Sequence, residues 1–188
     1  MFCGSGRGRQ PRYAMAAREL GAQMAARAYG LVYGGGRIGL MGEIASAVLE
    51  AGGEAVGVIP EALLKREVGH GALTRLEVVD SMHERKARMA ELADGFIAMP
   101  GGFGTFEEWF EIITWGQLGI HAKPCVLLNV DGYFDPLLQL VGHAVNEGFI
   151  RPAHERLFSV ADAPGAALDC IASIEPVRGE QWLSRDQS

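Results

Sequence analysis

The residues best suited to chemistry form one continuous segment, Pro100-Gly101-Gly102-Phe103-Gly104-Thr105-Phe106-Glu107-Glu108. The segment follows an apolar run at 95–99 that is typical of a buried strand, and it leads into a helical pattern of large apolar side chains. Three glycines at a strand-to-helix junction let backbone N–H groups approach a ligand closely, and the N-terminus of a helix favours an anion there. Because Glu108 adds a carboxylate to the first turns of the helix, the segment predicts a site that holds a phosphorylated molecule and also acts on it.

Two other glycine-rich segments follow expected strands: Gly4-Ser5-Gly6-Arg7-Gly8 and the loop 34–42, which begins with Gly34-Gly35-Gly36. One such turn is weak evidence, because strand-to-helix turns use glycine for positive φ and for close packing. Three of them in one small domain are much stronger evidence for a binding site. The second loop overlaps a dinucleotide fingerprint, but no acidic residue ends a strand at the expected distance, so we do not expect NAD.

A second motif, Ser81-Met82-His83-Glu84-Arg85-Lys86, opens another expected helix. Ser81 and Glu84 have the spacing of a capping box. That pattern does not account for Arg85 and Lys86, because the helix dipole disfavours cations in the first turns. A solvated basic pair is one explanation, and an anionic ligand held by Arg85 is the one we favour.

Glu108 has two roles that its spacing leaves equally open. Thr105 and Glu108 also fit a capping box, in which Glu108 would accept a hydrogen bond from the Thr105 N–H. The alternative is a catalytic carboxylate.

Alternating apolar runs and helical patterns predict the fold. The expected strands are 31–33, 55–59, 76–79, 95–99 and 125–128, after a short first strand at 1–3. The expected helices are 12–29, 40–51, 81–93, 105–118 and 135–147. This order predicts an α/β fold: one Rossmann-like domain, 1–188, in which a doubly wound parallel sheet has helices on both faces and binds ligands at the C-terminal strand ends. We expect a binding loop at 60–74 and a polar, loosely ordered tail at 175–188.

Composition excludes several classes of protein. The 188 residues carry a net charge of −6, which argues against binding nucleic acid or a membrane surface. Cys3, Cys125 and Cys170 are widely spaced and odd in number, so we expect buried thiols in a reducing cytoplasm, not disulfides or a metal cluster. We find no run long enough to span a membrane and no signal-peptide pattern, and we expect a cytoplasmic protein.

The segment 100–108 resembles the PGGxGTxxE signature of the LOG ("Lonely Guy") family of cytokinin riboside 5′-monophosphate phosphoribohydrolases. The resemblance covers roughly residues 3–150 and extends to the loop 34–42, Met82-His83-Glu84-Arg85-Lys86, Glu67-Val68-Gly69-His70 and Thr114-Trp115-Gly116-Gln117-Leu118-Gly119. Many members are labelled lysine decarboxylases. Decarboxylation of lysine normally needs a cofactor such as PLP, and none of the three lysines stands in a recognisable PLP context.

The resemblance implies a homodimer that hydrolyses the N-glycosidic bond of N6-substituted AMP, releasing the free base and ribose 5-phosphate without a cofactor or metal. It implies catalytic roles for Arg85 and Glu108. Together with the glycine-rich loops it gives these expected substrate contacts: Ser5, Gly35, Gly36, Glu67, Met82, Arg85, Lys86, Gly101, Gly102, Phe103, Gly104, Thr105, Phe106, Glu107 and Thr114. Gly6 stands where many members have a second serine, which leaves Ser5 as the only hydroxyl in its loop.

Two alternatives stay open at this point. One is a general AMP nucleosidase with little preference for N6 substituents. The other is a nucleotide or cofactor carrier without turnover, since molybdenum-cofactor carriers resemble this chain in fold and in a PGGxGT-like loop. The pair Arg85 and Glu108 favours an enzyme, because a carrier needs the glycine loops but not this pair. The helix 105–118 also carries more large apolar side chains than one face needs, namely Trp109, Phe110, Ile112, Ile113 and Trp115, which predicts a homodimer.

Overall fold

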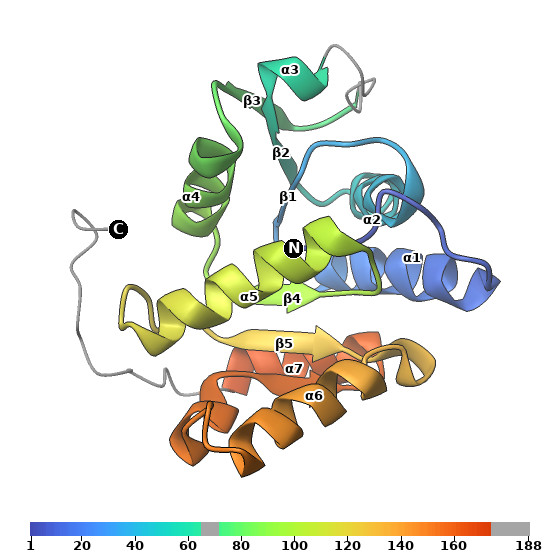
Figure 1. Ribbon diagram of the computed structural model, residues 1–188. Helices are drawn as coiled ribbons and strands as arrows, with labels where there is room; N and C mark the ends of the chain where they lie inside the picture. Colours follow the sequence, from blue (N-terminus) through green and yellow to red (C-terminus); the bar gives the residue numbers. More distant parts are fainter. Residues whose placement is uncertain (65–71, 174–188) are drawn as a thin grey trace.

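Short parallel strands form the centre of the molecule (Figure 1). The computed structural model describes residues 1–64 and 72–173. One parallel sheet has the order β1 (Leu31–Tyr33), β2 (Ala55–Pro60), β3 (Arg75–Val79). The other has the order β4 (Phe96–Ala98), β5 (Cys125–Leu128), β6 (Ser159–Ala161). Of these strands, β1, β2, β4 and β5 are largely buried.

Residues 1–3 join the two sheets. Phe2 forms a parallel bridge with Ala98, with hydrogen bonds of 3.0 Å from Phe2 N to the Ile97 carbonyl and 2.9 Å from Met99 N to the Phe2 carbonyl. On the other side, Met1 N donates to the Val32 carbonyl at 2.9 Å. The combined order is therefore β3-β2-β1-(1–3)-β4-β5-β6, and chain progression reverses direction at residues 1–3. In doubly wound sheets, ligands bind beside this reversal, beyond the C-terminal strand ends.

Helices cover both faces of the sheet (Figure 1). One face packs against α1 (Pro11–Ala26), α2 (Gly39–Glu50) and α7 (Pro164–Ser173). The other packs against α4 (Met82–Leu92), α5 (Phe103–Gln117) and α6 (Asp135–Asn146). Shorter elements complete the described chain: α3 (Glu61–Leu64) and the 3₁₀ turns η1 (Val130–Gly132) and η2 (Pro152–Leu157).

Alternation along the central strands separates two cores. In β4, Ile97 packs with α1, α2 and α7, whereas Phe96 and Ala98 pack with α4, α5 and α6. The period of two in a strand produces this division. The two cores hold the helices rigidly against the sheet and thereby fix the loops at the strand ends.

The predicted Rossmann-like α/β fold is confirmed, with local differences. Helix α5 begins at Phe103, two residues before the expected start, and Gly102 is its N-cap. The strand β6 and the helix α7 were not expected from the sequence pattern. The expected binding loop at 60–74 begins with α3, and its residues 65–71 lie outside the described residues, as does the tail 175–188. None of the helices described here has the length and apolar character to cross a bilayer.

Candidate active site

The N-terminus of α5 presents unpaired backbone amides. The N-cap residue Gly102 makes no side-chain cap, and the first helical hydrogen bond runs from Phe106 N to the Gly102 carbonyl at 3.1 Å. Within the described residues, the amides of 102–105 have no hydrogen-bond acceptor. Unpaired N–H groups at the positive end of a helix dipole form an anion-binding site.

The glycines of this turn have two different reasons to be glycine. A Cβ added to Gly101 would collide with the Thr105 hydroxyl and would lie 2.8 Å from Gly4 N, so the fold itself requires glycine there. A Cβ on Gly102 or Gly104 would meet nothing within 4 Å. The open side of these two residues is where a ligand can approach the backbone.

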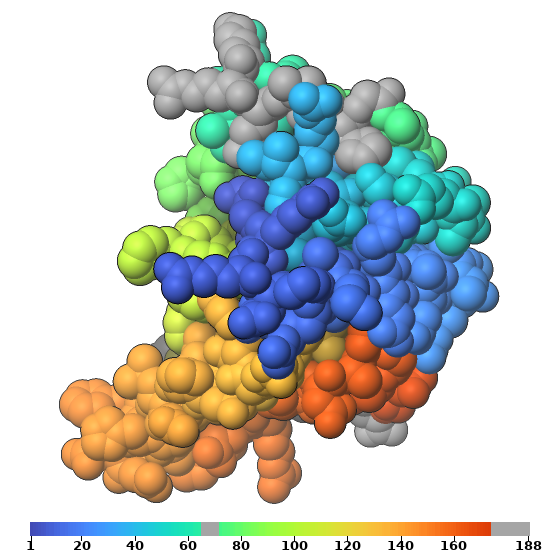
Figure 2. All heavy atoms as spheres, turned by 90° about the vertical axis from the view of Figure 1, so that its right-hand side faces the viewer, coloured from blue at the N-terminus to red at the C-terminus, as the bar shows by residue number. Residues whose placement is uncertain are grey.

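A cavity of about 270 Å³ lies where this turn meets the loop that follows residues 1–3. The two loops are joined by a 3.0 Å hydrogen bond from Gly4 N to the Pro100 carbonyl. Figure 2 shows the first loop, in dark blue, beside the beginning of α5, in yellow-green. The cavity lining includes Ser5, Arg7, Tyr13, Gly101, Gly102 and Tyr133.

The carboxylate of Glu108 and the guanidinium of Arg85 form a buried ion pair. Arg85 Nη1 donates to Glu108 Oε1 at 2.8 Å, and Arg85 Nε donates to the Val58 carbonyl at 3.1 Å. Arg85 is only 8% exposed and Glu108 only 7%. A Cβ on Gly34 would collide with Arg85 Nη2, so the loop after β1 closes over the guanidinium. The alternative capping role of Glu108 is wrong, because its carboxylate is bound to Arg85 and Thr105 lies inside the helix.

Burial controls the electrostatics of this pair. It raises the pKa of Glu108 above its ordinary value, and the neighbouring Arg85 guanidinium offsets part of that rise. A carboxylate in so dry a place interacts strongly with any positive charge that develops near it.

Lys86, the neighbour of Arg85, is bound to α5. Its ammonium donates to Glu111 Oε1 at 2.9 Å and also contacts Glu107. Burial by itself would lower the pKa of Lys86. The hydrogen bonds to the two carboxylates outweigh this effect, so the pKa of Lys86 is raised above its ordinary value. The expected substrate contacts of Lys86 and Glu107 stay predictions. The observed contacts connect α4 to α5 beside the Arg85–Glu108 pair.

The motif that opens α4 is capped as the sequence predicts. Ser81 Oγ accepts from Glu84 N at 3.1 Å. Glu84 Oε2 reaches back one residue further than expected and accepts from Asp80 N at 2.9 Å. This cap fixes the start of α4, from which Arg85 projects.

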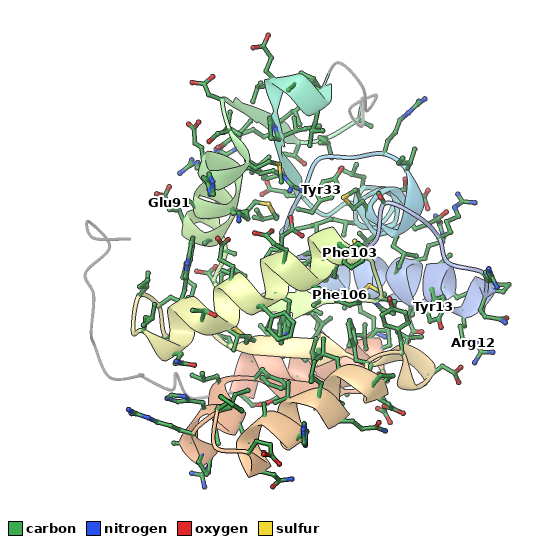
Figure 3. The ribbon with its side chains drawn as sticks, viewed as in Figure 1. Arg12, Tyr13, Tyr33, Glu91, Phe103 and Phe106 are labelled. Carbon is green, nitrogen blue, oxygen red and sulfur yellow. The ribbon has the colours of Figure 1, made fainter. Side chains whose placement is uncertain are left out.

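The other predicted site residues are dispersed around this centre. Phe103 and Phe106 lie at the beginning of α5 (Figure 3); Phe103 is 92% exposed and Phe106 is half-buried. Met82 is exposed at the first turn of α4. Thr114 lies on the exposed face of α5, where its hydroxyl donates to the Phe110 carbonyl at 2.7 Å. Glu67 lies outside the described residues.

Further polar and buried features belong to the same region. Gly35 and Gly36 are buried in the turn after β1, and Ser5 is exposed beside the cavity. Among residues 1–64 and 72–173, no three His, Cys, Asp or Glu side chains are grouped so as to hold a metal.

Sequence reasoning missed Tyr133, whose hydroxyl donates to the Gly101 carbonyl. The signal was the turn Asp131-Gly132, two residues after the apolar run 125–128. A turn at that position must lie at the same C-terminal edge of the sheet as the glycine loops.

The sequence profile described as "Possible lysine decarboxylase" matches residues 41–171. A rice (Oryza sativa subsp. japonica) protein named a probable cytokinin riboside 5′-monophosphate phosphoribohydrolase is 55% identical over 165 residues, which cover 87% of this chain and 73% of the relative. A protein of Rhodococcoides fascians, named cytokinin riboside 5′-monophosphate phosphoribohydrolase, is 52% identical over 168 residues, 88% of this chain and 85% of the relative.

Solved structures show the same fold in more distant proteins. The molybdenum cofactor binding protein of the phototrophic bacterium Rippkaea orientalis superposes with a TM-score of 0.68 at 22% sequence identity, covering 91% of this chain and 93% of that chain. At this identity the likeness concerns the fold alone. The family profile and the relatives near 50% identity, in contrast, match most of the length of this chain, and they show that it belongs to the family described as possible lysine decarboxylases, the LOG family of phosphoribohydrolases.

Proposed function

We propose that this protein hydrolyses the N-glycosidic bond of adenosine 5′-monophosphates, including N6-substituted ones, and releases the free base and ribose 5-phosphate. The observation that carries the proposal is the buried Arg85–Glu108 pair beside the unpaired amides of α5. The names of the relatives in the LOG family support the same reaction.

The amides of 102–105 are suited to the 5′-phosphate, because they point from a helix N-terminus without an acceptor of their own. Ser5, at the adjoining cavity, offers a hydroxyl to the same phosphate. Glu108 follows Gly104 by four residues, about 6 Å along the helix axis. That separation is comparable with the distance between the phosphorus and the anomeric carbon of a ribose 5-phosphate unit.

Glu108 is suited to stabilise the ribose when its glycosidic bond breaks. The transition state of glycoside cleavage develops oxocarbenium character, which a nearby carboxylate stabilises while it orients or activates the attacking water. Arg85 holds this carboxylate by one nitrogen and has further donors for a ribose hydroxyl or the phosphate. Because the phosphate anchors the sugar, binding energy far from the bond positions it for attack.

We also propose a homodimer. The exposed face of α5 carries Phe103 and Phe110, with Met82 exposed on the neighbouring α4. Trp109 and Ile112, which the sequence suggested for the interface, are buried in the protein's own core. A second copy of the chain would therefore cover the phenylalanines. A cytoplasmic setting is supported by Cys3, Cys125 and Cys170, which are free thiols; burial raises the pKa of both Cys3 and Cys125 to about 12.

The test is to incubate purified protein with AMP, N6-isopentenyl-AMP and the matching ribosides, and to quantify base and ribose 5-phosphate by chromatography. We expect equal amounts of the two products from the monophosphates and poor reaction of the ribosides and of the di- and triphosphates. Comparable turnover of riboside and monophosphate would contradict the phosphate anchor. Tight binding of AMP without any free base would instead indicate a carrier, and the ratio of the two monophosphate rates gives the base preference.

A further inference from the structure

The turn 99–104 accepts one hydrogen bond from a residue that belongs neither to this turn nor to the loop 4–8: the Tyr133 hydroxyl donates to the Gly101 carbonyl. We propose that Tyr133 is a positioning residue that aims the phosphate-binding amides of α5. The proposal rests on the function proposed above and adds a residue from the turn after β5 to that site.

The planar peptide unit gives this hydrogen bond its effect. The Gly101 carbonyl and the Gly102 N–H belong to one trans peptide, so they point in opposite directions. When Tyr133 holds the oxygen, it also fixes the direction of the Gly102 N–H, the first of the unpaired amides. This peptide joins two glycines, which restrict backbone rotation less than any other residue pair. An external donor to the carbonyl therefore adds a direct restraint on the orientation of this peptide.

The ring of Tyr133 is itself held in place. It packs edge-on against Tyr13 at 5.8 Å and against Phe134 at 5.0 Å between ring centroids. The turn η1, which directly precedes Tyr133, is connected to α1 by an ion pair between Arg12 and Asp131. Figure 3 shows Arg12 and Tyr13 at the beginning of α1.

Asn129 fixes the turn from within. Its Oδ1 accepts from Phe134 N at 2.6 Å, and its Nδ2 donates to Asp135 Oδ1 at 2.8 Å. The phenol of Tyr133 thus projects from a turn held by side chains on both sides. A donor fixed in this way can orient its acceptor.

Tyr133→Phe removes only the hydroxyl and keeps the aromatic packing. Tyr29→Phe is the matched control, because it removes a tyrosine hydroxyl just after the C-terminal end of α1, away from the cavity lining, and the contacts of the described residues give that hydroxyl no hydrogen bond. The ligands are ribose 5-phosphate, which contains the phosphate, and adenosine, which lacks it. Dissociation constants from isothermal titration calorimetry do not depend on turnover, and the ¹⁵N–¹H shift of Gly102 reports the peptide without any ligand.

We expect Tyr133→Phe to weaken ribose 5-phosphate binding by about 5- to 10-fold, the effect of one hydrogen bond, to shift the Gly102 amide resonance, and to leave adenosine binding within about twofold. Tyr29→Phe should change the affinity for neither ligand by more than about twofold. Equal behaviour of the two variants, or equal weakening of both ligands by Tyr133→Phe, would overturn the proposal, as would wild-type protein that does not bind ribose 5-phosphate. Failure of the hydrolysis with this pattern of binding intact would count against the proposed reaction alone.

Discussion

Glu108 keeps a carboxylate in a place from which water is nearly excluded, with Arg85 as its partner. Such a group is costly for folding, because both charges lose hydration and the pair regains only part of that free energy. A surface pair would stabilise the helices at less cost. The buried position therefore supports the proposed catalytic role, which needs a negative charge of high local effect.

Glu108→Gln separates charge from shape. The amide oxygen can still accept from Arg85, so we expect the variant to fold, to bind AMP and to lose roughly two or more orders of magnitude in kcat. Arg85→Ala should abolish turnover and also weaken nucleotide binding. Glu91→Gln, on the outer side of α4 (Figure 3), is the control and should leave kcat unchanged. Steady-state kinetics with thermal unfolding checks these expectations; near-wild-type kcat in Glu108→Gln would refute the catalytic assignment.

The pKa of Glu108 predicts the acid limb of the pH profile. Burial raises this pKa, so the carboxylate takes up a proton at a higher pH than an ordinary glutamate. If the ionised form is the active one, kcat/KM falls as pH decreases through the raised pKa, above the ordinary value of about 4.3. A pH–rate profile on AMP measures it. A profile that is flat through this range, or that rises toward acid, would show that ionised Glu108 is not required.

At the scale of elements, the strand-to-helix turn 99–104 both packs against the protein and faces the proposed ligand. Its glycines divide into Gly101, which touches the protein, and Gly102 and Gly104, which face open space. The turn can thus be altered on its packed side or on its open side.

Gly102→Ala and Gly101→Ala form a matched pair. The methyl group on Gly102 finds space in the folded chain, so we expect unchanged thermal stability and a clear loss of affinity for the monophosphate, because the methyl group occupies the ligand's side. The methyl group on Gly101 collides with Thr105, so that variant should be destabilised by about 1–3 kcal/mol. Thermal unfolding and AMP titration distinguish the two. Loss of stability in Gly102→Ala with normal binding would contradict this division.

Much of this arrangement could be predicted from the sequence, and the exceptions have physical causes. The strands around 31–33, 55–60 and 125–128 were predictable because buried parallel strands are continuous apolar runs. The start of α5 was not, because Thr105 packs its hydroxyl against Gly101 instead of capping the helix. The contact between Thr105 and the glycine turn takes the place of the expected cap.

The sequence identified residues of the candidate site better than it identified the contacts between them. Arg85 and Glu108 could be named from spacing and from family resemblance, but their hydrogen bond depends on α4 and α5 packing side by side. The same holds for Lys86, whose carboxylate partners lie more than twenty residues away along the chain. No local pattern encodes such pairs.

At the scale of the whole molecule, the exposed face of α5 is the least explained surface of the isolated chain. Phe103 and Phe110 are seven residues apart, so they lie on one side of the helix, 92% and 43% exposed. Solvent exposure of such a phenylalanine pair favours association with another apolar surface.

We expect Phe110→Asp to convert a dimer into a monomer, because a buried, unpaired charge opposes association. Met15→Asp on α1, at a side chain that is 68% exposed, is the control and should remain dimeric. Light scattering at micromolar concentration measures both. Wild-type protein that is monomeric under these conditions would count against the dimer.

The reversal of strand order at residues 1–3 divides the molecule into two halves that meet at this segment. Arg85 and Lys86 come from the half that contains β1, β2 and β3, while Glu107, Glu108 and Glu111 come from the half that contains β4, β5 and β6. The three ion pairs between these residues therefore connect the two halves, in addition to the backbone hydrogen bonds of residues 1–3. A nucleotide bound between Arg85 and the amides of α5 would contact both halves, so part of its binding free energy would also hold the two halves together.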